Sequence, residues 1–426
     1  MLKGLSPLRL RVIIVLSFVA IALLTGLLFV RPWETIPAGG TPAPDDPPEH
    51  KKIRTAEISL NPALSWELSL AGNNKEEAVA SFVRGGYLYI FGNTASFDLD
   101  FDRPGVFLAV IDVYGLTKGF FVYGGENEVL RAVTLCEGGF LLAVEVPTSP
   151  KLYVVDFSGN QTRVISGFLP SFESVWEVKY YSGGYLLFTG PANNLTGIKG
   201  LRCCFFTTAL EFSSSRLAVS PYSLEHFESV VISNRAVALV NAVSTLHTLP
   251  AAVEFSQSDS PKIHIFTGFA GAIAGLSIFE GEFLLLTAME GASLLQITLD
   301  YTVKNRVFLS QLSALSFTEV GPYNPMQLYL AFVDSAVYLI NGKGERKATL
   351  PAFIPAKHAG GRAYAGDLVV YAGEGGVRAY SNQKVELAAN IGGGGRDSFI
   401  VMDENNLFYI YHVSGDVRIV KLRTMY

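Results

Sequence analysis

The amino-acid sequence predicts an all-β protein, a β-propeller of four-stranded blades behind one N-terminal transmembrane helix. Three observations predict this fold: the composition, a regular repeat of paired apolar runs, and a charge-free apolar segment near the N-terminus. Hydrophobic residues make up 49% of the 426 positions and aromatic residues 12%, with 41 glycines, as in sheet proteins with many tight turns. The formal net charge of -5 comes without a long basic run, so we expect no nucleic-acid partner.

Residues 12–30, VIIVLSFVAIALLTGLLFV, contain no charged side chain. A helix of this length, at about 1.5 Å per residue, just spans a hydrocarbon core of about 30 Å. Lysine and arginine precede it, whereas Arg31 is the only Lys or Arg among the next twenty positions, so residues 1–11 are expected in the cytoplasm. A cleaved signal peptide is the alternative, but its apolar region is usually shorter and no small-x-small site follows Val30. We therefore expect a signal anchor that binds the lipid bilayer through residues 12–30.

The segment that follows the anchor is a linker over residues 31–53. Its central part, PAGGTPAPDDPPEHKK, is rich in proline and has no apolar periodicity. Such a composition is typical of a semi-extended spacer. The propeller is then expected over residues 54–426, outside the cytoplasm, in a single-pass protein of the cell membrane.

Beyond residue 54 the chain repeats one unit, a pair of apolar runs around a turn. The first pair is ASFVRGGYLYIFG, and the turns follow one another at a mean interval of about 46 residues. The turns are centred on Gly85, Gly138, Gly183, Asn234, Gly281, Asn324, Gly366 and Asn405. Glycine and asparagine suit two-residue hairpin loops, which need positive φ at their central positions.

Each hairpin is followed by a third apolar run and often a fourth. Four strands at a period of 40 to 50 residues are typical of a β-propeller blade. We expect the strand before each turn at the outer edge of one unit and the strand after it at the inner edge of the next. Eight units fit between Trp66 and Val420, or seven if the repeat at Asn324 is a distorted insertion. Two β-sandwiches are the rival, which the regular spacing disfavours.

Ring closure is expected between the last unit, which ends VRIVKL (417–422), and the first. The early run TAEISL (55–60) is available as an added outer strand.

One stretch carries a family resemblance. The run WELSLAGNNKEEAVASFVRGGYLYIFGNTASF (66–97), followed by GVFLAVIDVYG (105–115), resembles the repeat of secreted bacterial β-propellers, in which a Trp strand leads to a GGY hairpin. The resemblance is clearest over residues 66–190 and weak after residue 210. It implies a propeller in an extracytoplasmic setting. Members of that family mostly lack an assigned activity, so it implies no catalytic residue.

The search for chemistry yields one weak metal candidate. Asp98, Asp100 and Asp102 alternate as at the start of an EF-hand calcium loop, but Arg103 and Ala109 stand where that loop needs Gly and Glu. A solvated acidic loop is the favoured interpretation. The six histidines are scattered without metal-ligand spacing, and no phosphate or cofactor motif is present, so we expect no cofactor, no catalytic metal and no identified catalytic residue.

Three cysteines are too few for a disulfide framework. Cys136 is expected to be a small buried hydrophobe. Cys203 and Cys204 are adjacent on a predicted strand, so their side chains should point to opposite faces, with a vicinal disulfide as the alternative.

Loop length suggests where a ligand binds. The connections that we assign between third and fourth strands are short in five units and long over 93–105, 190–202 and 241–251. All connections of one type emerge on one face, and loops longer than the fold needs are often functional. The ligand face is therefore expected to carry Asp98, Asp100, Asp102, Leu195, Ile198 and His247. Neutral variation of loop length is the alternative.

These observations favour a membrane-anchored extracytoplasmic propeller, a monomer that acts as a binding or scaffolding module for an envelope protein or glycan. A carbohydrate-active enzyme, a hydrolase or lyase that uses the central channel, is one alternative, and an envelope-assembly scaffold is another. Recognition by loops on a rigid disc is the common use of such folds, which is an argument from fold alone.

Overall fold

The structure is a computed structural model. It describes residues 64–72, 74–96, 103–169, 173–181, 183–190, 200–232, 235–288, 291–310, 314–319, 328–333, 336–350, 363–365, 368–373, 376–381, 384–390, 398–402 and 406–422. The chain divides into two units, Met1–His50 and Lys51–Tyr426, and every described residue belongs to the second. The predicted membrane segment 12–30, the linker and the run 55–60 lie outside the described residues. Among those described, no helix has the length and apolarity needed to cross a membrane.

Every regular element in the described part of the chain is a β-strand, and most strands form antiparallel meanders of four consecutive strands. The first four meanders are β2 (Glu76–Arg84), β3 (Tyr87–Thr94), β4 (Gly105–Asp112) and β5 (Thr117–Tyr123); β6 (Val129–Cys136), β7 (Gly139–Glu145), β8 (Lys151–Asp156) and β9 (Gln161–Ile165); β10 (Ser174–Tyr181), β11 (Gly184–Gly190), β12 (Gly200–Phe206) and β13 (Phe212–Val219); β14 (Ser223–Ile232), β15 (Arg235–Val243), β16 (Thr248–Phe255) and β17 (Lys262–Ile265).

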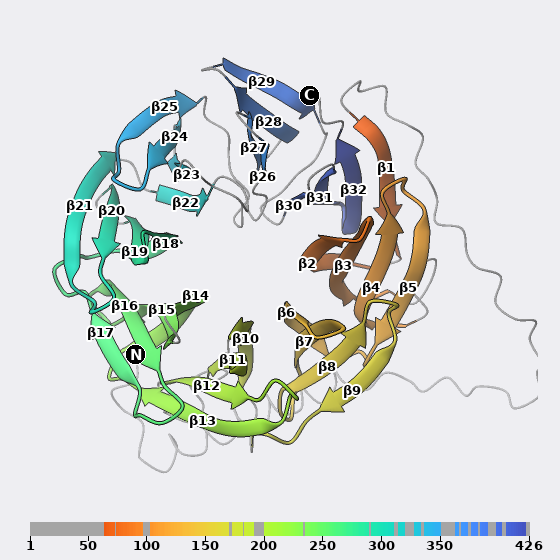
Figure 1. The fold of residues 1–426 in the computed structure, drawn as a ribbon, viewed down its shortest axis with the longest axis horizontal. Helices are drawn as coiled ribbons and strands as arrows, with labels where there is room; N and C mark the ends of the chain where they lie inside the picture. Colours follow the sequence, from red (N-terminus) through yellow and green to blue (C-terminus); the bar gives the residue numbers. More distant parts are fainter. Residues whose placement is uncertain are drawn as a thin grey trace, which may run out of the picture. The chain divides into compact units, whose positions relative to one another are not determined.

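The second half of the chain continues the pattern. Its meanders are β18 (Ala272–Phe279), β19 (Glu282–Ala288), β20 (Ala292–Ile297) and β21 (Val303–Ser310); β22 (Ala314–Glu319), β23 (Leu328–Val333), β24 (Ala336–Asn341) and β25 (Arg346–Leu350); β26 (Ala363–Ala365), β27 (Leu368–Gly373), β28 (Gly376–Ser381) and β29 (Lys384–Asn390). One parallel pair, Gly275 with Phe317, joins β18 to β22 and merges two of these meanders into an eight-stranded sheet. Within the Lys51–Tyr426 unit, Figure 1 shows the first strand of each meander toward the centre of a ring and the fourth at its rim.

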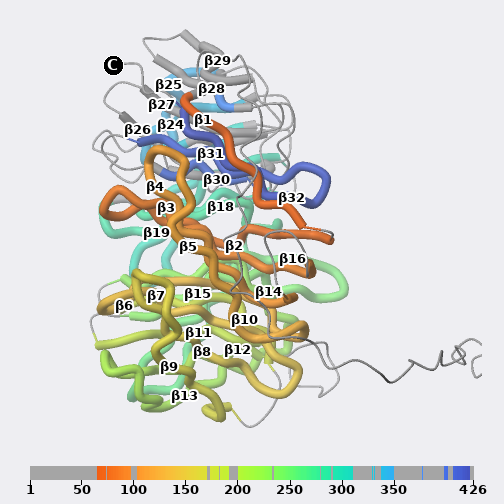
Figure 2. Tube along the Cα trace, turned by 90° about the vertical axis from the view of Figure 1, so that its right-hand side faces the viewer, coloured from red at the N-terminus to blue at the C-terminus, as the bar shows by residue number. Residues whose placement is uncertain are grey.

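The ring is closed by strands from the two ends of the described chain. β30 (Phe399–Met402), β31 (Leu407–Val413) and β32 (Asp416–Leu422) form a sheet whose fourth, outer strand is β1 (Leu64–Leu70), and Figure 2 shows β1 beside β32. Trp66 pairs with Lys421 across this junction. The closing strand is therefore 64–70, whereas the sequence suggested 55–60, and Trp66 belongs to the last sheet rather than to the first unit.

The predicted turns are the hairpins between the first and second strands of each sheet. At Gly85–Gly86 both φ angles are positive, 59° and 78°, as a two-residue turn of this type requires. The expected strand order was wrong: the strand before each turn is the inner strand of its own sheet, and the strand after it is the second strand of the same sheet.

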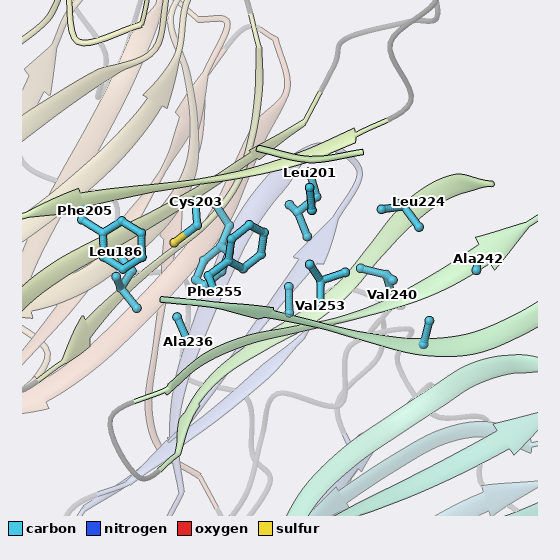
Figure 3. Packing of buried hydrophobic residues seen from close by; sticks show 14 residues of the cluster. Leu186, Leu201, Cys203, Phe205, Leu224, Ala236, Val240, Ala242, Val253 and Phe255 are labelled. Carbon is cyan, nitrogen blue, oxygen red and sulfur yellow. The ribbon is translucent and has the colours of Figure 1, made fainter. Parts of the chain in front are cut away.

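The core lies between neighbouring sheets rather than within one. The second strands β3, β7 and β11 are buried on both faces over nearly their whole length, because a neighbouring sheet covers each face. Figure 3 shows one such layer, in which Leu186 and Cys203 pack against Phe255 of the next sheet. Cys204 points into the opposite layer, as predicted, and both thiols are free. Cys136 is only half-buried.

A second contact between sheets recurs at the rim. The fourth strand of one sheet contacts the turn between the third and fourth strands of the next. Trp66 Nε1 donates to Val113 O at 3.0 Å, and Tyr123 Oη donates to Gly159 O at 2.7 Å. The His264 ring stacks on Tyr301 with a centroid distance of 3.8 Å. These contacts fix the angle at which successive sheets meet.

Candidate functional site

Six of the inner strands carry a β-bulge at the same place. In β2 the register passes from Ala78 opposite Gly92 to Ala80 opposite Phe91, so Val79 has no partner. The bulged residues are Val79, Arg131, Trp176, Phe227, Ala274 and Leu315. A bulge inserts one residue, bends the strand and re-aims a side chain. The bulge thus recurs at an equivalent position in these six inner strands.

Four of these bulged residues line one cavity. It has a volume of about 360 Å³ and lies along the inner strands β2, β6, β10 and β14. Its charged and aromatic lining comes from Arg131, Trp176, Glu177, Lys179, His226 and Phe227. The cavity is thus lined by residues of four sheets, and its charged side chains come from β6 and β10.

A recurring hydrogen bond joins the second strand of one sheet to the inner strand of the next, just before four of these bulges. A polar side chain at the end of a second strand binds the backbone N–H of the residue that precedes the bulge in the next sheet. We call this contact the inner latch. The N–H of Leu130 donates to Asn93 Oδ1 at 2.7 Å, and that of Ile273 donates to Asn241 Oδ1 at 2.8 Å.

Two further junctions use the same latch. The N–H of Ala78 donates to His412 Nε2 at 2.9 Å, which makes the latch part of the ring closure. The N–H of Val175 donates to Glu145 Oε2 at 3.2 Å. Asparagine, glutamate and histidine thus serve the same purpose, because each offers a side-chain acceptor for a backbone N–H.

Among the second strands whose ends the structure describes together with the following inner strand, two lack a polar side chain at the latch position. At the end of β19 the residue is Ala288, and there the inner strands meet directly through the pair of Gly275 and Phe317. At the end of β11 the residue is Gly190, and a Cβ there would collide with the Trp176 indole. The Trp176 ring stacks on His226 with a centroid distance of 5.1 Å. The junction between β11 and β14 is therefore filled by an aromatic pair that borders the cavity.

His226 is neutral at this junction. Burial lowers the pKa of its imidazole to about 3, and the Lys179 ammonium acts in the same direction. Its Nε2 lies 2.7 Å from Ser229 Oγ and 3.6 Å from Glu177 Oε2. Glu177 in turn accepts the Ser229 N–H at 2.6 Å and pairs with Lys179 at 2.5 Å. The carboxylate therefore carries a compensated charge at the cavity wall.

The grouping of Ser229, His226 and Glu177 is not a catalytic triad. A triad needs the serine on one ring nitrogen and the acid on the other. Here both partners meet Nε2, and Ser229 is fully buried, so its hydroxyl is closed to a substrate. Within the described ranges no cluster of three His, Cys, Asp or Glu residues could hold a metal ion.

The cavity is suited to recognising a polar chain. The Arg131 side chain is 45% exposed and pairs with Glu145 at 3.2 Å, while the Lys179 side chain is 33% exposed. Their N–H groups can donate to carboxylate, carbonyl or hydroxyl oxygens. The bulged Phe227 and the Val79 side chain add apolar surface beside them. Such a mixed wall combines orientation by hydrogen bonds with contact area.

Most of the predicted ligand-face residues lie outside the described residues: Asp98, Asp100, Asp102, Leu195 and Ile198. The calcium candidate therefore stays a prediction. His247 is described, and it ends a turn in which Ser244 N–H donates to His247 O at 2.9 Å. His247 is exposed and does not line the cavity.

The assignment of the three long connections needs correction. They join second to third strands, namely β3 to β4, β11 to β12 and β15 to β16, rather than third to fourth. The connection over 241–251 is also short, because β15 runs to Val243 and β16 begins at Thr248. Only the other two remain longer than a tight turn.

Comparisons with known proteins bear on the fold. No family model and no curated protein matches the sequence. Among solved structures, the Dos1 propeller has a TM-score of 0.54 at 13% identity, over 84% of this chain and 94% of that one. The WD40 domain of Neurospora crassa Pan2 has a TM-score of 0.47 at 10% identity, over 82% of this chain and 90% of that one. A chain of a mitotic checkpoint complex has a TM-score of 0.48 at 10% identity, over 92% of this chain and 100% of that one.

The match to the Dos1 propeller and the four-stranded meanders establish the fold as a β-propeller. At 13% identity the likeness shows the fold alone.

Proposed function

We propose that this protein is a membrane-anchored, extracytoplasmic β-propeller that binds an envelope protein or glycan at the cavity on its inner strands. Counting the two meanders of the eight-stranded sheet separately gives eight blades. Residues 12–30 would hold the protein in the membrane as a signal anchor, and the GGY hairpin repeat would place it with the secreted bacterial propellers. The alternative partner classes are separated by the experiment below.

The observation that carries this proposal is the junction at Gly190, the one junction between cavity strands without an inner latch. The two other junctions between cavity strands have the latch, through Asn93 and Glu145, and so does the junction that follows β14, through Asn241. The junction at Gly190 does not, and Trp176 and His226 occupy its place beside the cavity. Local departures from a structural rule concentrate at functional sites. A binding role follows because the neutral His226 and the compensated Glu177 offer recognition groups without an activated nucleophile.

The test uses the full chain in nanodiscs, chemically crosslinked to envelope preparations and then purified. The variants Arg131→Ala and Lys179→Ala each remove one exposed donor of the cavity. Lys304→Ala and Lys347→Ala are matched controls, since each removes an exposed lysine that pairs with a glutamate away from the cavity. We expect recovery of one discrete partner by the parent and the controls, and a drop of about tenfold for each cavity variant.

Three other outcomes are informative. Recovery that survives both cavity variants but falls when the connection over 93–105 or 190–202 is shortened would assign binding to the loop face. A partner that is a glycan would be recognised by its loss after glycosidase treatment. Absence of any discrete partner for the parent would refute the binding role.

A further inference from the structure

Five turns between third and fourth strands share one backbone geometry. Each closes through two hydrogen bonds: the N–H of the first residue donates to the carbonyl of the fifth, and the N–H of the fourth donates to the carbonyl of the first, all at 2.8–3.0 Å. The fourth residue has positive φ in every case, for example 88° at Gly115 and 89° at Gly159. The turns run over 112–116, 156–160, 207–211, 298–302 and 341–345.

One of these turns differs from the other four in the character of its third and fifth side chains. The third and fifth positions project from the turn, and in four turns they are polar or small: Ser158 and Asn160, Ala209 and Glu211, Asp300 and Thr302, Lys343 and Glu345. In the turn over 112–116 they are Tyr114 and Leu116, which are 80% and 60% exposed. The same backbone forms in four turns without apolar side chains at these positions, so the turn geometry does not require them. Because Tyr114 and Leu116 are largely exposed, packing in the core does not explain them either.

The turn over 112–116 lies beside β1, the first described strand of the chain. Val113 O accepts hydrogen bonds from Trp66 Nε1 at 3.0 Å and from Lys421 Nζ at 2.9 Å. A Cβ on Gly115 would lie 3.0 Å from the Trp66 ring, so the two segments are in contact. Trp66 stands two residues after Leu64, the first residue of β1. The exposed pair therefore lies next to β1, which is the first described strand after the predicted anchor in the sequence.

The charge at this turn does not oppose an anionic surface. Asp112 Oδ1 accepts the N–H groups of Tyr114 and Leu116, each at 2.9 Å, and Asp112 pairs with Lys118 at 3.0 Å. Burial alone would raise the pKa of Asp112, but the Leu116 N–H and the Lys118 ammonium outweigh it, and the pKa lies below its usual range. The carboxylate is thus used to hold the turn rigid and is neutralised by a neighbouring cation.

We propose that Tyr114 and Leu116 insert into the bilayer interface and rest this edge of the propeller on the membrane. The inference depends on the anchor in the proposed function. Tyrosine is enriched at membrane interfaces, and leucine gains from leaving water. In the sequence, 33 positions separate the predicted anchor, which ends at Val30, from Leu64. At about 3.1 Å per residue, the spacing of an extended Pro-rich segment, they reach at most about 100 Å. A tether of this length raises the effective concentration of the propeller at the membrane and so strengthens a weak insertion.

The experiment measures membrane depth at single sites of the full chain in nanodiscs. A small fluorophore is attached to Leu116→Cys, and quenching by lipids with a nitroxide near the headgroup is recorded. Asn160→Cys is the matched control, because it has the equivalent position in a sibling turn. Leu246→Cys is the second control, because Leu246 is 79% exposed on the turn between β15 and β16, across the ring in Figure 1. The unmodified chain gives the background from its three native cysteines.

We expect quenching at residue 116 to exceed that at residues 160 and 246 at least threefold, and Tyr114→Ser to reduce it toward the controls. Equal quenching at all three positions, in chains recovered with the nanodiscs, would overturn the membrane contact while leaving the anchor intact. A chain that is not recovered with nanodiscs at all would refute the anchor and, with it, the contact that depends on it. Circular dichroism of each variant confirms that the sheets are retained.

Discussion

Removing one inner latch should destabilise the propeller by a predictable amount. Asn93 makes two hydrogen bonds to the next sheet: its Nδ2 donates to Leu130 O at 3.1 Å, and its Oδ1 accepts the Leu130 N–H at 2.7 Å. Asn93→Ala removes both and leaves two partly buried backbone groups without these partners. Since an unsatisfied buried group costs about 1–2 kcal/mol, the loss should be about 2–4 kcal/mol.

This loss converts into a melting temperature. The entropy of unfolding near the midpoint is about 2.1 cal/mol/K per residue, which for the unit Lys51–Tyr426 gives about 0.8 kcal/mol/K. The midpoint of Asn93→Ala should therefore fall by about 3–5 °C in differential scanning calorimetry of the full chain in detergent. Asn241→Ala removes one hydrogen bond, of 2.8 Å from the Ile273 N–H, and should lower the midpoint by about half as much.

The control is Asn305→Ala, an exposed asparagine on β21, whose midpoint should stay within about 1 °C of the parent. The argument for the latch fails if Asn93→Ala melts together with Asn305→Ala. It also fails if Asn93→Ala and Asn241→Ala are equally costly, since the difference between them reflects the number of bonds removed.

Three further predictions follow from the fold and the site. The folded pKa of His226 is about 3, below its usual value of about 6.5, so the folded protein keeps the imidazole neutral where the unfolded chain takes up a proton. The free energy of unfolding should therefore fall as the pH falls below about 6.5, and between pH 7 and 5 the parent should lose about 2 kcal/mol more than His226→Gln in urea unfolding. Parallel losses would contradict the assignment. Deleting residues 414–426 removes β32 from between β31 and β1 and exposes two strand edges, so cooperative unfolding should disappear, whereas an unchanged transition would show β32 to be peripheral. A chain of residues 54–426 should elute as a monomer in gel filtration without detergent, and recovery only in inclusion bodies would count against it.

The hairpin turns were predictable because their backbone restricts the residue type. Positive φ at Gly85 and at Gly281 favours glycine on steric grounds, so each turn leaves a mark in the sequence. The period of these marks predicted four strands per unit. The order of strands within a unit was not predictable in the same way, since a repeat shifted by one strand has the same period. The strand pairings show where each sheet begins, and the pairing of β1 with β32 shows that the first described strand completes the last sheet.

One misassigned connection has a local explanation. The predicted connection over 241–251 took in the ends of two strands, including Pro250, a residue type that is rare within sheets. In the structure Pro250 lies within β16, opposite Asn241, and its carbonyl accepts the Phe266 N–H at 3.0 Å. The strand therefore tolerates the missing donor near its beginning, and the connection before it is short.

The cavity residues were missed because bulges leave no pattern in one sequence. Trp176 and Arg131 sit within apolar runs whose alternation is shifted by a single position. The inner latch left a weak signal, a polar residue at the end of the second run in each of several units, as at Asn93 and Asn241. That signal acquires meaning only when the register shows that these positions are equivalent.

The repeat also supplies an internal reference for function. Equivalent positions in the sheets of a ring are under the same packing constraints. A position where one sheet departs from the others is therefore not explained by packing alone. At Gly190 the inner latch and its stabilising hydrogen bond are missing, and the aromatic pair that fills this junction borders the cavity. Tyr114 and Leu116 expose apolar surface that adds nothing to the folded core. Since these departures lie on different elements, the two activities that we infer should be separable: variants at Tyr114 and Leu116 should alter membrane depth and leave partner recovery unchanged, and variants at Arg131 should do the reverse.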